Sequence, residues 1–257
     1  MKYVQGFYPI LKKKNTANGI YEMDIHAPEI ASRAVPGQFV HIGVTGHSLR
    51  RPISICRIDK EQGTIQIVFA LKGQGTKDLA KLEEGFQLDV IGPLGNGFPL
   101  LESDKKVVLI GGGIGVPPML GLSDYYKEHA KAITGFRDQS IIILQDAFAE
   151  NGTETILCTD DGSAGRKGFV SQPLEEMLAA GEHVDMICAC GPMPMLKVIA
   201  QIAEKYGVRC AVSLEQHMGC GIGACLVCSV PIKREGETEF LHVCKDGPVF
   251  DSKEVMW

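Results

Sequence analysis

The chain has 257 residues, of which 45% are hydrophobic and 22% charged, and its formal net charge is −5. This composition is typical of a globular protein with a substantial core, and the length predicts two domains with a further small module. The longest basic run is only Lys12–Lys14, which argues against a nucleic-acid partner. The chain start lacks an apolar signal segment, and no unbroken apolar run could span a bilayer, so we expect no membrane partner and a cytoplasmic location.

Residues 1–99 contain short β-runs separated by turn residues. Segments such as QFVHIGV and TIQIVFAL are bounded by Gly, Pro or polar residues, and several strands in so short a span predict a small antiparallel barrel or sandwich. One helix interrupts the strands in GTKDLAKLEEG. We expect Thr76 to be its N-cap and Gly85 to end it.

Residues 100–214 alternate buried strands with helices. KVVLIGGG, ETILCTD and VDMICACG are continuous apolar strands, and MLGLSDYYKEH and SQPLEEMLAAG have helical patterns. Alternation of this kind predicts a parallel sheet with crossover helices. The chain therefore combines a β domain with an α/β domain, followed by a cysteine-rich module at residues 215–257.

Two loops at strand ends predict a nucleotide site in the α/β domain. GGGIGVPPML departs from the G-x-G-x-x-G pattern, but it follows a buried strand and begins a helix, as in a dinucleotide crevice. Prolines offer no N–H groups, so Gly111, Gly112, Gly113 and Gly115 are the candidates for close approach to the nucleotide. CGPMPML repeats the design, and Cys190 is the candidate to touch the reactive nicotinamide ring; the alternative is a buried structural thiol.

The nine cysteines are unevenly distributed. Cys220, Cys225 and Cys228 are spaced Cys-x4-Cys-x2-Cys, and Cys244 follows after a gap of fifteen residues. This is the plant-type spacing of [2Fe–2S] ligands, in which a later strand supplies the fourth. The intervening glycines, Gly219, Gly221 and Gly223, would let the backbone wrap closely around a cluster. Structural zinc and unrelated free thiols are the alternatives, but zinc favours two closely spaced ligand pairs and only one is present here.

A second cofactor signal lies in the β domain. RRPISI places Arg51 and Ser54 on a strand, where an arginine fork could hold a pyrophosphate and a hydroxyl could bond a flavin edge. The helix beginning near Thr76 offers N–H groups to an anion. The alternative is a salt-bridged barrel arginine beside an ordinary capped helix.

In this order, these segments resemble the ferredoxin reductase superfamily, and within it the electron-transfer subunit of class 1B dihydroorotate dehydrogenase. The resemblance covers essentially the whole chain and is carried by RRPISI, FRDQS, TDDGSAGRKGFV, CGPMPML, SLEQHMGCGIGACLVC and HVCKDGPVF. It implies an FAD-binding antiparallel β-barrel at residues 1–99, a parallel α/β NAD-binding domain at residues 100–214 and a [2Fe–2S] module at residues 215–257.

The resemblance also implies site residues and a partner. The four clustered cysteines would hold the [2Fe–2S] cluster, and FAD would be bound by Arg51, Pro52, Ile53, Ser54, Val68, Phe69, Ala70, Gly75 and Thr76. The family works beside an FMN-containing catalytic subunit that oxidises dihydroorotate in pyrimidine biosynthesis, and we expect a heterotetramer of two subunits of each kind. Because NAD+ accepts two electrons together and a cluster passes one, a flavin is needed between them.

Three points stay open at this stage. Arg137 could accommodate the 2′-phosphate of NADP, but Asp138 could neutralise it. A related FAD and [2Fe–2S] subunit of an NADH-dependent ferredoxin:NADP reductase, a sulfide dehydrogenase or a hydrogenase would have the same domain order. A redox-sensing binding protein is the alternative from another class.

Overall fold

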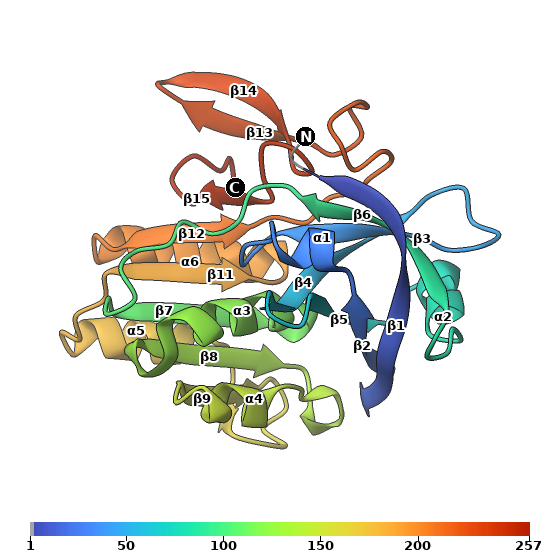
Figure 1. Cartoon of the computed structure of the whole chain (residues 1–257). Helices are drawn as coiled ribbons and strands as arrows, with labels where there is room; N and C mark the ends of the chain where they lie inside the picture. Colours follow the sequence, from blue (N-terminus) through green and yellow to red (C-terminus); the bar gives the residue numbers. More distant parts are fainter. Residues whose placement is uncertain (1–2) are drawn as a thin grey trace.

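The computed structural model describes residues 3–257, and its N-terminal part is a closed antiparallel barrel (Figure 1). The strand order around the barrel is β1-β2-β5-β4-β3-β6. The strands are β1 (Val4–Ala17), β2 (Ile20–His26), β3 (Phe39–Gly43), β4 (Arg51–Asp59), β5 (Thr64–Ala70) and β6 (Gln87–Leu94). Alternate side chains, such as Val40 and Ile42 of β3, point into an apolar barrel core. The expected β-barrel is confirmed.

The barrel carries two short helices, α1 (Pro28–Ala31) and α2 (Gln74–Leu79). The predicted boundaries of the second helix were wrong at both ends. The N-cap is Gly73, in extended conformation, and Thr76 is the third helical residue. The Thr76 hydroxyl turns back and accepts hydrogen bonds from the N–H groups of Lys72 at 3.0 Å and Gly73 at 3.2 Å, so it caps the helix from inside. The helix ends at Leu79, well before Gly85.

The second domain is built on a seven-stranded sheet of order β10-β9-β8-β7-β11-β12-β15. All neighbouring strands are parallel except β15, which runs antiparallel to β12. The strands are β7 (Val107–Gly112), β8 (Ala130–Phe136), β9 (Glu154–Thr159), β10 (Arg166–Lys167), β11 (Met186–Cys190), β12 (Arg209–Ser213) and β15 (Val249–Asp251). The helices are α3 (Pro117–Tyr126), α4 (Gln145–Glu150), α5 (Ser171–Ala179) and α6 (Met193–Lys205), with 3₁₀ turns at Gly113–Gly115, Lys127–His129 and Gln139–Ile141. The predicted α/β class is confirmed.

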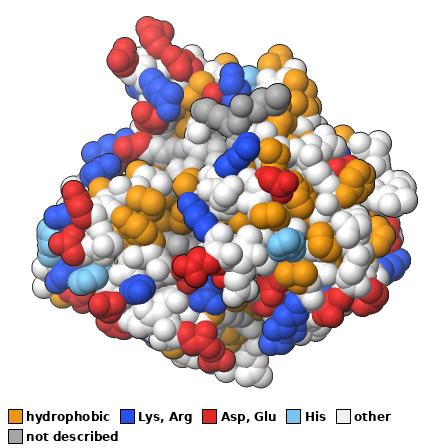
Figure 2. Space-filling view, in the orientation of Figure 1, with side chains coloured by type: hydrophobic (Ala, Val, Ile, Leu, Met, Phe, Trp, Pro, Cys, Tyr) orange, Lys and Arg blue, Asp and Glu red, His pale blue; other side chains and the backbone are white. Residues whose placement is uncertain are grey.

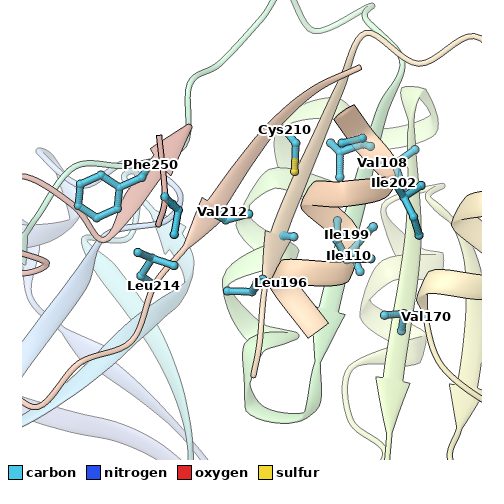
Figure 3. Close-up of a cluster of buried hydrophobic side chains, with 14 of the residues drawn as sticks. Val108, Ile110, Val170, Leu196, Ile199, Ile202, Cys210, Val212, Leu214 and Phe250 are labelled. Atoms are coloured by element: carbon cyan, nitrogen blue, oxygen red, sulfur yellow. The ribbon is translucent and has the colours of Figure 1, made fainter. Parts of the chain in front are cut away.

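The core of this domain explains why its strands are continuously apolar. Every residue of β7 is buried, because helices cover both faces of the sheet. Figure 3 shows Leu196, Ile199 and Ile202 of α6 packed toward Val108 and Ile110 of β7. Burying each such side chain contributes about 1.5–3 kcal/mol to folding. Residues 3–257 contain no helix with the length and apolarity needed to cross a membrane.

The C-terminal segment is joined to both domains. After β12 come the cysteine loop, which we define as residues 218–228, and the hairpin of β13 (Ser229–Arg234) and β14 (Glu237–His242). Cys244 lies in the turn after β14 and not within a strand. The chain then returns as β15, where Phe250 pairs with Val212 at the sheet edge. The loop after β6 contacts the same turn, since the Asn96 amide donates to the carbonyls of Lys245 and Asp246 at 3.2 and 2.8 Å.

The barrel and the sheet meet along β4 and α3. Arg57 donates from Nε and one terminal nitrogen to the carboxylate of Asp124 at 3.0–3.2 Å, and it also reaches the side-chain oxygen of Asn151 at 3.2 Å. Gly121 of α3 lies so close to the Cys56 carbonyl that an added Cβ would be only 3.1 Å from it. This packing fixes one side of the barrel against the first helix of the α/β domain. The division at 99/100 and 214/215 stays a proposal.

Candidate functional site

The four clustered cysteines converge in the C-terminal segment. Cys228 and Cys244 are 1% and 2% exposed, whereas Cys220 and Cys225 are half-buried. The thiols lie in two pairs: Cys225 is close enough to Cys220 to affect its pKa, and Cys228 is close enough to Cys244 to do the same. Within residues 3–257, no three ligand-type side chains are placed to hold a single metal ion. Two pairs of thiols fit a two-iron cluster, which takes two thiolates on each iron.

Backbone N–H groups surround two of these sulfurs. The Cys220 sulfur accepts from the N–H groups of Ala224 at 3.2 Å and Cys225 at 3.3 Å, and the Cys244 sulfur accepts from Gly223 at 3.1 Å. Burial alone would raise the pKa of Cys220, but these donors and that of Ile222 outweigh it and lower the pKa to about 6. Burial and the neighbouring Cys228 thiol raise the pKa of Cys244 to about 12. The loop therefore already favours negative charge on its first sulfur, as thiolate ligation requires.

Each of the three glycines of the cysteine loop has a close neighbour at the position of an added Cβ. A Cβ on Gly219 would lie 3.3 Å from the Cys225 sulfur. Gly221 and Gly223 have φ values of +74° and +80°, which L-residues with a side chain rarely adopt. A Cβ on Gly223 would be 2.6 Å from the Lys245 side chain, and one on Gly221 would overlap the His41 ring. The predicted close wrapping of the backbone is thus present.

Two barrel residues at this site were not predicted from the sequence. His41 of β3 is fully buried against Gly221, and Asn96 holds the turn that contains Cys244. Burial lowers the pKa of His41 to about 4, so its ring is neutral. A lone histidine in a strand and an asparagine in a Gly-Asn-Gly turn give no sequence signal of a cofactor site, because both act through a fold contact distant in the chain.

Four of the nine candidate FAD residues lie on β4, three on β5 and two on α2. Pro52 and Ser54 alternate with the core residues Ile53 and Ile55 and so point away from the barrel interior. Ile53 and Phe69 point into the barrel core, and Val68 packs in the interface with the α/β domain. Any contact of these three with FAD would therefore involve backbone atoms. Ala70 lies at the end of β5 and is partly exposed.

Arg51 and α2 meet as the sequence suggested. Arg51 donates to the Leu49 carbonyl at 2.7 Å and lies 3.2 Å from Nδ1 of His47. Its guanidinium rests on Gly75, where an added Cβ would overlap Nε. The His47 ring is held in turn by Asp78 of α2 at 3.0 Å. A cation is therefore fixed beside the first turn of α2, but this helix is too short for its dipole to add much.

The two glycine-proline loops of the α/β domain are in contact. A Cβ on Gly115 would overlap the Cys190 carbonyl, and one on Gly112 would be 2.6 Å from the Met195 sulfur. Gly111 packs equally closely on Val116, so these three glycines serve the packing of strand ends against helices. Gly113, with φ +55°, has no described atom within 4 Å of its Cβ position and is the one that faces open space.

Cys190 ends β11 beside Ser213 of β12. Burial raises the pKa of its thiol to about 12 although the nearby Ser213 side chain lowers it, so the thiol stays protonated. Its proposed contact with nicotinamide would be that of a neutral thiol. At the end of β8, Arg137 donates to Asp138 at 3.1 Å. The sequence alone did not decide whether these two side chains pair.

Comparison with known proteins decides the family. A family model described as the iron-sulfur cluster binding domain of dihydroorotate dehydrogenase B matches residues 215–256. A protein from a Geobacillus species named dihydroorotate dehydrogenase B (NAD+), electron transfer subunit, is 40% identical, and the match covers 96% of each chain. The chain belongs to this family of electron-transfer subunits.

A second relative agrees with that assignment, and two solved structures are similar in fold. The electron transfer subunit of dihydroorotate dehydrogenase B from Caldanaerobacter subterraneus is 39% identical, and the match covers 96% of this chain and 97% of the length of that protein. Among solved structures, the NADH-dependent reduced ferredoxin-NADP oxidoreductase matches with a TM-score of 0.86 and 32% identity, covering 98% of this chain and 90% of its own. A ferredoxin reductase of carbazole 1,9a-dioxygenase, with 17% identity, a TM-score of 0.69 and coverage of 80% of this chain and 67% of its own, shares the fold.

Proposed function

We propose that this chain is the electron-transfer subunit of an NAD+-reducing dihydroorotate dehydrogenase in pyrimidine biosynthesis. The observation that supports it best is the combination of 40% identity across the whole chain with two thiol pairs that lie against the flavin-type barrel. Cys220, Cys225, Cys228 and Cys244 would hold a [2Fe–2S] cluster. Arg51, Pro52, Ser54, Gly75 and Thr76, with the backbone of Ile53 and of the last residues of β5 (Val68, Phe69, Ala70), would hold FAD.

The division of work between two subunits explains which groups this chain contains. When bound, the cluster and FAD supply the change from single-electron to hydride chemistry. The chain positions them and orients the nicotinamide at the loops of Gly113 and Cys190. It needs no general base, because removal of the substrate protons belongs to the FMN-containing partner. Asp138 neutralises Arg137, which favours NAD+ over a nucleotide with a 2′-phosphate.

The cysteine loop is the proposed docking surface for the catalytic subunit. Ile222, Leu226 and Val227 are 37%, 77% and 57% exposed, which is unusual for side chains of this size and type. In Figure 2 charged side chains cover the tip of the β13–β14 hairpin at the upper left, and apolar side chains gather at the upper right, toward the open end of the hairpin. A partner that covers the loop would bury these side chains and exclude water near Cys220 and Cys225. We expect a heterotetramer with two subunits of each kind.

A reducing compartment suits this site. All nine cysteines are free thiols, and the four clustered ones must stay reduced to bind iron. This supports the proposal of a cytoplasmic location.

The experiment that tests the function is anaerobic co-expression with and without a candidate FMN subunit. We expect the purified complex to reduce NAD+ with dihydroorotate, and the subunit alone to retain only NADH oxidation with ferricyanide. The Cys225→Ser variant should lose iron and the dihydroorotate-dependent reaction while retaining FAD and the ferricyanide reaction. A complex that contains both cofactors but does not transfer electrons from dihydroorotate to NAD+ would contradict the proposal.

One alternative has a specific observation in its favour. The structure of a bifurcating NADH-dependent ferredoxin-NADP oxidoreductase matches nearly the whole chain at 32% identity. A subunit of that type would co-purify with an NADPH-oxidising partner, and dihydroorotate would leave its flavin oxidised. The same co-purification therefore separates the two functions.

A further inference from the structure

His41 lies on the outer face of the barrel, in line with the candidate FAD strand. It pairs across the sheet with Pro52 of β4, and Phe39, two residues earlier on β3, pairs with Ser54. Val40 and Ile42 fill the barrel core, so the imidazole points outward on the same face as Pro52 and Ser54. Paired residues on one face of a sheet are within contact distance of each other. The ring therefore lies beside Pro52, on the face of β4 that is assigned to FAD.

The other side of the ring meets the cysteine loop. The position that a Cβ of Gly221 would occupy is filled by Nδ1 of His41, and Gly221 follows the first cluster ligand, Cys220. Backbone groups of Cys220 and Arg50 are near enough to favour the protonated ring, although neither completes a hydrogen bond with it. His41 thus fills the space between the strand assigned to FAD and the loop assigned to the cluster.

The ring has hydrogen-bonding groups that no protein atom uses. His41 is 0% exposed, and neither Nδ1 nor Nε2 has a partner. Among residues 3–257, the only other buried side-chain nitrogen without a partner is Nε2 of His242, whose Nδ1 lies 3.4 Å from the Asp246 carboxylate. A neutral imidazole always carries one N–H, and an apolar residue would fill the same space without leaving a buried donor unpaired. A bound group next to the ring would use that N–H.

We propose that His41 is a positioning residue between the two cofactors of this subunit. Its ring fixes the Cys220–Gly221 segment against the FAD-binding strand, and its free N–H is donated to a sulfur of the bound cluster. The inference rests on the proposed function, because it requires FAD on β4 and iron at Cys220. The cluster is the partner that the geometry favours, since Nδ1 faces the backbone of the ligand loop itself. Hydrogen bonds from residues that surround the ligands of a metal site orient those ligands and change the reduction potential of the metal.

The test uses the anaerobically purified complex with His41→Leu, His41→Asn and a control, His129→Ala, which changes a surface histidine of the α/β domain. His41→Leu keeps the bulk and removes the N–H. We expect it to retain FAD and iron, to shift the EPR spectrum of the reduced cluster and to make its reduction potential more negative, because a donor to sulfur is lost. Dihydroorotate-dependent NAD+ reduction should fall roughly tenfold. NADH oxidation with ferricyanide, which needs FAD and the nucleotide loops but not the cluster, should be unchanged.

The conservative variant separates hydrogen bonding from packing. Asparagine carries an amide N–H near the position of Nδ1, so His41→Asn should restore the cluster potential toward the wild-type value more than His41→Leu does. A purely structural role predicts the reverse order, since leucine packs better than asparagine in a buried site.

Gly221 gives an independent check of the contact. Gly221→Ala should lower the iron content in the wild-type background and less so when combined with His41→Ala, because removal of the ring makes room for the new methyl group. Gly236→Ala is the matched control, since Gly236 has φ +89° in the same module and nothing within 4 Å of its Cβ position.

The two possible failures are distinguishable. If the wild-type complex lacks iron or does not reduce NAD+ with dihydroorotate, the proposed function fails and the role of His41 fails with it. If the wild type performs the reaction and the His41→Leu cluster has the wild-type EPR spectrum and potential, only the role of His41 is overturned.

Discussion

At the scale of single residues, glycines decide which side chains can reach the cofactor sites. Gly75 gives room for the Arg51 guanidinium, and Gly221 gives room for the His41 ring. Both pairs join residues far apart in the chain. A sequence pattern can therefore mark a glycine as unusual without naming the side chain for which it makes room.

The pair of Gly75 and Arg51 gives a direct prediction. Gly75→Ala adds a methyl group where the guanidinium lies, whereas alanine at Gly73, the N-cap of α2, meets no atom within 4 Å. Displacing Arg51 removes a charge-assisted contact with a pyrophosphate, which is worth about 1.5–3 kcal/mol. We expect FAD binding to weaken by roughly tenfold or more in Gly75→Ala.

The measurement is a flavin fluorescence titration of the deflavinated protein, with Gly73→Ala as the matched control. Equal FAD affinity in the two variants would show that Arg51 does not contact the cofactor.

Residue-level prediction was possible where the chemistry is local. The four cysteines could be proposed as ligands from spacing alone, because three of them share one loop. The buried His41 could not, since nothing in QFVHIGV distinguishes it from an ordinary strand histidine. The candidate nucleotide loop was intermediate. The sequence placed it after a buried strand, and the structure has β7 there, but only the structure separates the packing glycines from Gly113.

At the scale of elements, the sequence patterns of apolar residues predicted the long strands and helices but not the short ones. The buried runs of β7, β9 and β11 and the helices α3 and α5 lie where apolar periodicity placed them. The boundaries of α2 differ from the prediction, because Thr76 bonds backward to Gly73 instead of beginning the helix. The three-residue strand β15 owes its conformation to pairing with β12, which no local pattern encodes.

The contact between β4 and α3 allows a test of how the two domains are held. Arg57→Ala removes the two-pronged ion pair with Asp124 and leaves that carboxylate one-third exposed without its cation. Because solvent screens the pair, we expect a cost of about 1 kcal/mol and a fall in Tm of about 2–4 °C. NADH oxidation with ferricyanide should fall more than FAD content, since hydride transfer needs the barrel and the nucleotide loops aligned.

Arg234→Ala is the control for this variant, because Arg234 pairs with Glu254 inside the C-terminal segment at 2.9 Å. Its effect on Tm and on the ferricyanide reaction should be smaller. If Arg57→Ala left both quantities unchanged, the ion pair would not hold the domains in register.

At the scale of the whole molecule, one apolar cluster joins all three parts. It runs from β7 and β11 through Phe250 of β15 to Cys228 and Cys244, and it includes Phe39 and Leu94 of the barrel. The cysteine segment is therefore an extension of the sheet that also rests on the barrel. The order of the parts was predictable from the sequence, but this sharing of one core was not, because it depends on contacts between residues more than a hundred positions apart.

This arrangement leads to the central claim, that the four cysteines hold two irons beside the flavin-binding strand. The most direct test is metal and sulfide analysis of the anaerobically purified protein, together with EPR of the reduced sample. We predict two irons and two sulfides per chain, a [2Fe–2S] signal, and their loss in Cys225→Ser with FAD retained. One zinc per chain, or no metal at these thiols under strictly anaerobic conditions, would contradict the account.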